Sequence, residues 1–336
     1  MLRAIRERDY LWTRRQLLQT VGALTVGGTL TRTRPTAAAP GHQEAPLMQI
    51  GILMNTFERP TLEARLDALK ACGLHCGQLS MGCVGLPAMP DEIAPELVAR
   101  IRREADARGI TIASLAGTFN MSHPDAEQRR LGLRRLRVLA AICQPLGTSK
   151  IHLCTGTRDP NNMWRRHPDN DSPEAWRDMV ACVREATAIA RQAGVILAFE
   201  PEVNNVVDSA QKARRLLDEI GSPQLKVTMD PANIFHAGEL ARMSEMLDQA
   251  FALLGKDIVL THAKDLSRDG DAGHEAAGRG KLDYDRYLSL LHAYGFQGPL
   301  LLHGLTEAQV PGCVAFLRDK LARVALAPAK FLPGSS

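Results

Sequence analysis

Four residues of metal-binding types each close a short apolar run in the second half of the chain. The runs are Leu197-Ala198-Phe199-Glu200, Val227-Thr228-Met229-Asp230, Val259-Leu260-Thr261-His262 and Leu300-Leu301-Leu302-His303. Apolar runs of this length are typical of buried strands. Two carboxylates and two imidazoles at one edge of a parallel sheet predict a site for one divalent ion, Mn²⁺, Zn²⁺ or Mg²⁺. The alternative is that each residue only caps its own strand.

The elements that must position these residues alternate regularly along the chain. Strands are expected at 49–54, 76–81, 111–116, 150–154, 195–199, 225–229, 258–261 and 299–302, and helices at 60–72, 91–108, 125–144, 172–193, 208–220, 239–255, 283–294 and 307–325. Eight strand–helix repeats predict an α/β fold of one domain, the closed parallel (β/α)8 TIM barrel. An open doubly wound sheet is the alternative, but its glycine-rich phosphate loop is missing after the first strand, where Asn55-Thr56-Phe57 follows.

The basic charge of the chain is confined to its first residues. The formal net charge is +4, and residues 1–39 alone carry +5, so residues 40–336 carry −1. This charge and the 4% aromatic content argue against nucleic acid as a partner. The early segment has Arg14 and Arg15, then a mild apolar stretch and Ala37-Ala38-Ala39. This order is similar to a twin-arginine export signal.

The sequence therefore divides into a signal segment (1–39), a linker (40–47), the barrel (48–325) and a C-terminal tail (326–336). We expect the twin-arginine export machinery as a partner and a periplasmic location. Pro40 directly after the alanines can impair cleavage, in which case the segment stays as a membrane anchor. After processing we expect no stable membrane span, and the sequence is compatible with an oligomer.

Residues in and beside the expected loops are further candidates for substrate contact. Trp164, in a long loop after the fourth strand, can stack on a sugar ring or pack against its own loop. Lys264, beside His262, can orient a substrate hydroxyl. His152 is more typical of a barrel interior, and Glu202, Asn204 and His274 are weaker candidates.

Several short motifs, in their order and spacing, identify a family. They are Phe199-Glu200-Pro201, Met229-Asp230-Pro231-Ala232-Asn233, Thr261-His262-Ala263-Lys264-Asp265, Gly278-Arg279-Gly280-Lys281-Leu282-Asp283-Tyr284 and Gly295-Phe296-Gln297-Gly298-Pro299-Leu300. Across nearly all of residues 48–325 the chain resembles the xylose isomerase-like barrel superfamily of sugar phosphate isomerases, epimerases and endonuclease IV-type enzymes. The resemblance implies Glu200, Asp230 and His262 as metal ligands and Arg268 as a substrate-binding residue.

Two positions depart from the pattern that the resemblance implies. His303 replaces the glutamate usual at the end of the eighth strand, and Asn233 replaces a histidine found in many relatives. Asn233 can still bind a substrate hydroxyl, and His303 can still bind metal. Epimerisation then needs Glu200 as one acid–base group. The other is His303, if it is not held to the metal, or Glu307.

The function expected from these residues is a metal-dependent sugar isomerase or epimerase. It acts on a small polyhydroxylated carbonyl compound by proton transfer through a metal-stabilised enediolate. Three alternatives stay open: a sugar lyase or dehydratase using the same site, an endonuclease IV-like phosphodiesterase, and a carbohydrate-binding barrel without catalysis.

Overall fold

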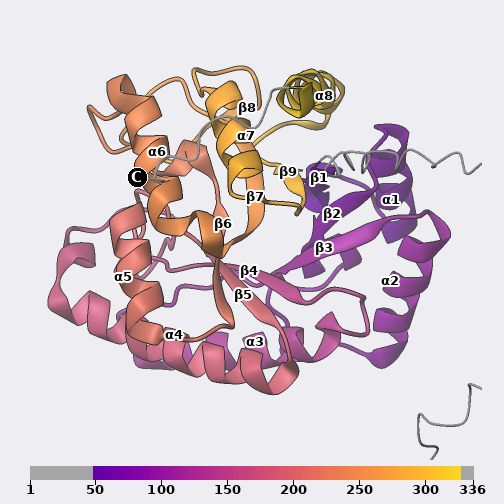
Figure 1. Cartoon of the computed structure of the whole chain (residues 1–336). Helices are drawn as coiled ribbons and strands as arrows, with labels where there is room; N and C mark the ends of the chain where they lie inside the picture. Colours follow the sequence, from indigo (N-terminus) through magenta and orange to yellow (C-terminus); the bar gives the residue numbers. More distant parts are fainter. Residues whose placement is uncertain (1–47, 327–336) are drawn as a thin grey trace, which may run out of the picture. The chain divides into compact units, whose positions relative to one another are not determined.

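Eight parallel strands close into a barrel in the computed structural model, which describes residues 48–326 (Figure 1). The strands of the barrel are β1 (Ile50–Leu53), β2 (Cys76–Leu79), β3 (Thr111–Ala116), β4 (Lys150–Cys154), β5 (Ile196–Glu200), β6 (Leu225–Met229), β7 (Ile258–Asp265) and β9 (Leu300–Leu302). Neighbours in sequence are neighbours in the sheet, and the β6–β7, β7–β9 and β9–β1 pairings complete the ring. The predicted (β/α)8 barrel is confirmed.

The barrel interior is filled by side chains. Cys76, Ala113 and Leu301 form a buried cluster inside the sheet. Glycine at position 51 permits this packing, because a Cβ there would lie 2.5 Å from the Cys76 sulfur and 2.7 Å from a Leu301 methyl. The interior therefore offers no channel for a ligand, and in barrels of this kind the active site lies at the carboxyl end.

Eight helices surround the strands (Figure 1). They are α1 (Leu62–Ala71), α2 (Pro95–Ala107), α3 (Ala126–Cys143), α4 (Pro173–Ala193), α5 (Ala210–Ile220), α6 (Met243–Leu254), α7 (Tyr284–Ala293) and α8 (Val310–Leu326). Polar side chains cap the starts of several of them: the Ser172 hydroxyl accepts from the Ala175 amide, and Ser209 and Asp283 act likewise. None of the helices from residue 48 to 326 is long and apolar enough to cross a membrane.

Some helices and strands begin or end at residues other than those predicted from the sequence. β7 continues to Asp265, so His262 and Lys264 are strand residues and do not follow the strand. The extension is paired with β8 (Glu275–Ala276), a short antiparallel strand in what was expected to be an open loop. The expected helix 91–108 begins only at Pro95, which is favoured in a first helical turn. The signal segment with Arg14 and Arg15, the linker, and the tail after residue 326 lie outside the described residues.

Candidate metal centre and its cavity

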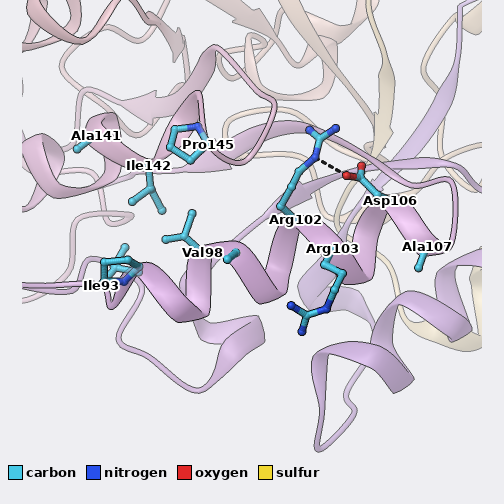
Figure 2. A pocket seen from close by; sticks show the side chains of 11 residues that line it. Ile93, Val98, Arg102, Arg103, Asp106, Ala107, Ala141, Ile142 and Pro145 are labelled. Carbon is cyan, nitrogen blue, oxygen red and sulfur yellow. Dashed lines mark hydrogen bonds and ion pairs between the residues drawn. The ribbon is translucent and has the colours of Figure 1, made fainter.

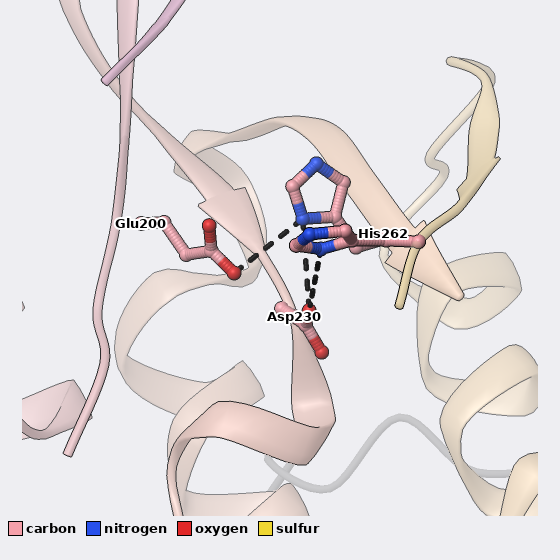
Figure 3. Close-up of side chains that lie close together, drawn as sticks. Glu200, Asp230 and His262 are labelled. Carbon is pink, nitrogen blue, oxygen red and sulfur yellow. Dashed lines mark ion pairs between the residues drawn. The ribbon is translucent and has the colours of Figure 1, made fainter. Parts of the chain in front are cut away.

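Glu200, Asp230, His262 and His303 meet at the carboxyl end of the barrel. Figure 3 shows the first three of them. Glu200 is the last residue of β5, Asp230 directly follows β6, His262 lies in β7 and His303 directly follows β9. One ligand atom from each side chain lies within 4.8 Å of those of the other three. Among residues 48–326 this is the one group of at least three potential metal ligands. The parallel barrel brings together residues that are more than 100 positions apart.

The ring nitrogens of the two histidines face the two carboxylates. Nδ1 of His262 lies 3.4 Å from Oε1 of Glu200 and 3.6 Å from Oδ2 of Asp230. Nδ1 of His303 also lies 3.6 Å from Oδ2 of Asp230. Oδ2 of Asp230, both ring nitrogens of His262 and Nδ1 of His303 are buried without a hydrogen-bond partner.

Buried polar atoms without a partner are costly. A divalent cation between Oδ2 of Asp230 and the Nδ1 atoms of His262 and His303 would satisfy these three atoms together, with Glu200 supplying a further oxygen. Two nitrogen and two oxygen ligands suit a borderline metal such as Zn²⁺ or Mn²⁺. The residues therefore fit one divalent ion.

Local backbone structure orients the Asp230 carboxylate. Residues Pro231–Asn233 form a 3-10 turn directly after β6, and Asp230 caps it. Oδ1 of Asp230 accepts a 3.0 Å hydrogen bond from the Ala232 amide. Because Oδ1 is engaged in this way, Oδ2 is left to face the imidazoles.

Asn233 is fully buried and orients Glu200. Its Nδ2 donates a 2.7 Å hydrogen bond to Oε1 of Glu200, and its Oδ1 accepts a 2.8 Å bond from the Gly273 amide. Both ends of the amide are therefore engaged, and Asn233 does not line the cavity described below. In this structure Asn233 holds a predicted metal ligand and does not face the space where a substrate hydroxyl would lie.

His152, from β4, completes the floor of the site. Its Nδ1 lies 3.0 Å from the Thr228 hydroxyl, and its Nε2 lies 3.4 Å from Oε2 of Glu200. Burial lowers the pKa of the His152 imidazole to about 3, although Glu200 opposes the shift. Because the His152 imidazole is neutral, it does not balance the negative charge of the Glu200 carboxylate.

The charges in the cluster are strongly coupled. Burial disfavours ionised Asp230, but the Lys264 ammonium and the two imidazoles outweigh it and hold the pKa of the Asp230 carboxyl well below its usual value. Burial likewise disfavours charged His262, yet Glu200 and Asp230 raise the pKa of its imidazole to about 9. Nζ of Lys264 lies 3.5 Å from Oδ2 of Asp230, and the lysine is only 5% exposed. In the metal-free protein, the charged His262 and Lys264 therefore balance the two carboxylates.

A cavity of about 570 Å³ opens over the cluster. Hydrogen-bonding side chains predominate in its lining: Asn55, Gln78, Ser80, Thr118, His152, Trp164, Glu200, Glu202, Asn204, Lys264, Asp271, His274 and His303, with Leu53, Ala116, Ala272 and Gly273. The volume is within the range of small-ligand sites. Trp164 is 45% exposed, so its ring is available at the mouth of the cavity. Many donors and acceptors beside one free aromatic ring suit a hydroxylated ligand.

Glu202 is a buried carboxylate in this lining. Its side chain is 5% exposed, and burial, together with the charge of Glu200, raises the pKa of its carboxyl to about 8. Asn204, on the same loop, donates a 2.8 Å hydrogen bond to Asp271 in the loop after β7. The loops after β5 and β7 are therefore joined at the rim.

Three further candidates lie apart from the cluster. Arg268 is exposed and does not line the cavity. His274 lines the cavity, but its Nε2 lies 2.9 Å from the Ser267 hydroxyl and it is not one of the four residues of the cluster. Glu307 forms an ion pair with Arg59 on the outer side of His303.

The sequence predictions identified site residues on the later strands but none directly after the first three. Asn55 follows β1, Ser80 follows β2 and Thr118 lies two residues beyond β3, and all three line the cavity. Their positions after strand ends are the same signal that identified Glu200 and Asp230. Their uncharged side chains gave no reason to single them out.

Another cavity, of about 890 Å³, lies on the outside of the barrel between α2 and α3 (Figure 2). Val98 and Ile142 form part of its apolar wall, and the ion pair between Arg102 and Asp106 lies at one side. None of the candidate site residues lines it, so the chemistry belongs to the cavity over the cluster.

Solved structures share this architecture at low sequence identity. A D-tagatose 3-epimerase-like protein superposes with a TM-score of 0.66 at 14% identity, covering 82% of this chain and 98% of its own. An L-ribulose 3-epimerase has a TM-score of 0.63 at 16% identity, covering 83% and 96%. A barrel protein from Mycobacterium smegmatis, solved in complex with magnesium, has a TM-score of 0.64 at 15% identity, covering 83% and 98%.

The sequence itself matches a known family over most of the barrel. No curated protein matches the chain closely enough to compare. The family described as "xylose isomerase-like TIM barrel" matches residues 66–319, which include all four residues of the cluster. The chain therefore belongs to the xylose isomerase-like TIM barrel family.

Proposed function

We propose that this protein is a metal-dependent sugar isomerase or epimerase that moves a proton beside the carbonyl of a polyhydroxylated substrate. The observation that carries the proposal is the cluster of two carboxylates and two imidazoles with unpartnered atoms at the floor of a polar cavity. The similar solved structures described as D-tagatose 3-epimerase-like and L-ribulose 3-epimerase support the same class of reaction.

One divalent ion, held by Glu200, Asp230, His262 and His303, would act as a Lewis acid toward the substrate carbonyl. It would thereby lower the pKa of the C–H group on the neighbouring carbon. Mn²⁺ or Zn²⁺ suits the mixed nitrogen and oxygen ligands. The similar barrel that was solved with magnesium keeps Mg²⁺ among the ions to be tested.

The chain's own residues supply the proton transfers. Glu200 is oriented by Asn233 and lines the cavity, so it is placed to take a proton from the carbon beside the carbonyl. His303 lines the same cavity from another strand and, when it is not held to the metal, is the group that returns a proton. The Lys264 ammonium donates hydrogen bonds to substrate oxygen, and Trp164 packs against the sugar ring.

Solvent deuterium exchange tests this function directly. The protein is stripped with a chelator, reloaded with Mn²⁺, Zn²⁺ or Mg²⁺, and incubated in D₂O with a panel of ketoses and 3-keto sugars. We expect NMR to show deuterium at the carbon beside the carbonyl, in the reloaded protein only. An Asp230→Asn variant serves as the control. Absence of exchange with all three metals across the panel contradicts the proposal.

His303 in place of a second carboxylate favours one other reaction at the same site, elimination by a sugar lyase or dehydratase. Imidazole is an effective acid near neutral pH and can protonate a leaving hydroxyl. The same NMR experiment separates the two reactions, because elimination yields an unsaturated or deoxy product and epimerisation yields an isomer of the substrate.

We also propose that the protein is exported through the twin-arginine pathway and acts in the periplasm. The support is the Arg14-Arg15 pair in a basic segment followed by a mild apolar stretch. Fractionation of cells that produce the full chain tests this. Replacing both arginines by lysine is expected to retain the protein in the cytoplasm, and unchanged export of that variant contradicts the proposal.

A further inference from the structure

A second cavity, of about 550 Å³, adjoins the first on the far side of His303. The two share Leu53, Asn55 and His303 in their linings. The remaining wall of the second cavity comes from the loops after β1 and β9 and includes Thr56, Glu58, Thr306 and Glu307. A ligand that lies over the cluster can therefore extend past His303 into the second cavity.

The loop after β1 is held in place by a buried arginine. The guanidinium of Arg65, in α1, donates hydrogen bonds to the carbonyls of Met54, Phe57 and Arg59. Arg65 is only 9% exposed, so these bonds are largely shielded from water. This wall of the second cavity is therefore fixed before any ligand binds, which reduces the entropic cost of binding.

The loop after β9 is held in a similar way. The Thr306 amide donates a 2.8 Å hydrogen bond to the Gln309 side chain, which caps the following turn. The Glu307 carboxylate receives two hydrogen bonds from Arg59, one of them 2.8 Å long. The ion pair ties the two loops together across the cavity.

The lining of the second cavity selects against an anionic group. It contains Glu58 and Glu307 but neither lysine nor arginine. The guanidinium of Arg59 is engaged with Glu307 and is therefore not free to bind an anion. Phosphate and carboxylate ligands are normally bound by arginine or lysine. Hydroxyl groups, in contrast, can donate to the carboxylates and bond with Asn55, Thr56 and Thr306.

We infer that the second cavity is a subsite for a neutral, hydroxylated second sugar unit, so that the substrate is a glycoside larger than one ring. The reacting sugar unit lies over the cluster, in the first cavity, which has Trp164 at its mouth. The second unit lies beyond His303, in the second cavity. The inference rests on the proposed function only in assigning the carbonyl to the unit over the cluster.

Direct binding measurements test the subsite without any turnover. Metal-loaded protein is titrated with glucose and with the disaccharides maltose, cellobiose and lactose, and affinities are obtained by saturation-transfer NMR. We expect at least one disaccharide to bind about tenfold tighter than glucose, which corresponds to about 1.4 kcal/mol. Binding of no disaccharide more tightly than glucose overturns the inference.

Two tryptophan variants test whether the second cavity causes the preference for disaccharides over glucose. Glu58 is exposed and lines only the second cavity, so Glu58→Trp fills that space and is expected to abolish the preference for disaccharides. Ala308 is exposed on the same rim and lines neither cavity, so Ala308→Trp is the matched control and is expected to keep the preference. An unchanged preference in Glu58→Trp overturns the inference.

The outcomes separate this inference from the proposed function. Tighter disaccharide binding without deuterium exchange on any carbonyl sugar supports the subsite and contradicts the isomerase proposal. Deuterium exchange together with equal binding of glucose and the disaccharides supports the isomerase and overturns the subsite.

Discussion

The side-chain amide of Asn233 donates a 2.7 Å hydrogen bond to Oε1 of Glu200, while its own oxygen accepts from the Gly273 amide. The loop after β7 therefore helps to orient a residue at the end of β5. Groups that hydrogen-bond to metal ligands fix the ligand's orientation and tune its affinity. Asn233 occupies that position for Glu200, which we propose as a metal ligand.

Replacing Asn233 with alanine is therefore expected to weaken metal binding by about 10–100-fold without unfolding the barrel. Isothermal titration with Mn²⁺ measures the affinity, and thermal denaturation of the metal-free protein checks the fold. Gln249→Ala, which removes an exposed side-chain amide, is the control. Equal affinity in the wild type and in Asn233→Ala would show that the hydrogen bond to Glu200 does not support the metal.

His303 and Glu307 are expected to differ sharply when each is replaced by alanine. His303 lines the cavity and faces Asp230, so His303→Ala is expected to lower the rate of epimer formation by about 10²–10⁴-fold or more. Glu307 is paired with Arg59 and lines only the second cavity, so Glu307→Ala is expected to leave measurable epimer formation. Full activity of His303→Ala would eliminate its role as the second acid–base group.

The barrel could be predicted from the sequence because each strand is a short apolar run and a glycine separates most helices from the next strand. The four residues of the cluster could be predicted for a related reason. Each lies in a strand or directly after one, and the parallel barrel brings those ends together. Both inferences need only local patterns and one rule of topology.

The environment of Asn233 could not be predicted in this way. From its type and position the residue was expected to bind substrate, but the 3-10 turn Pro231–Asn233 directs its side chain toward Glu200. Its other partner, Gly273, lies 40 positions later in a loop whose path depends on the unexpected strand β8. Side-chain direction in such a turn depends on contacts distant in sequence.

Metal loading is expected to release protons, because imidazole must be neutral to bind a metal. In the metal-free protein Glu200 and Asp230 raise the pKa of His262 to about 9, despite its burial. At pH 7 to 8 His262 is therefore charged, and binding of Mn²⁺ displaces close to one proton from it. Above pH 9 this release disappears, since the ring is already neutral.

Calorimetry in buffers that differ in ionisation enthalpy measures the number of protons released. The measured binding enthalpy should change linearly with the buffer's ionisation enthalpy at pH 7.5, with a slope near one proton, and the slope should fall toward zero above pH 9. A slope of zero at pH 7.5 would show that His262 is neutral before the metal binds, or that it is not a ligand.

Substitution of Gly304 tests whether Lys264 contacts the substrate. Gly304 follows β9 with a φ of +68°, and a Cβ there would lie 2.8 Å from Cδ and 3.1 Å from Cγ of Lys264. Gly295 has a similar φ of +71°, and a Cβ there would meet nothing within 4 Å. Replacement of either by alanine strains the backbone by about 1–2 kcal/mol. Only Gly304→Ala also displaces the lysine.

We therefore expect the two variants to lose similar thermal stability but to differ in activity. Gly304→Ala should lower kcat/KM about 10–100-fold more than Gly295→Ala, because a charged hydrogen bond to substrate contributes roughly 1.5–3 kcal/mol. In a Lys264→Met background, Gly304→Ala should cause little further loss, since both changes remove the same contact. Equal kcat/KM for the two single variants, or full additivity with Lys264→Met, would mean that Lys264 does not contact the substrate.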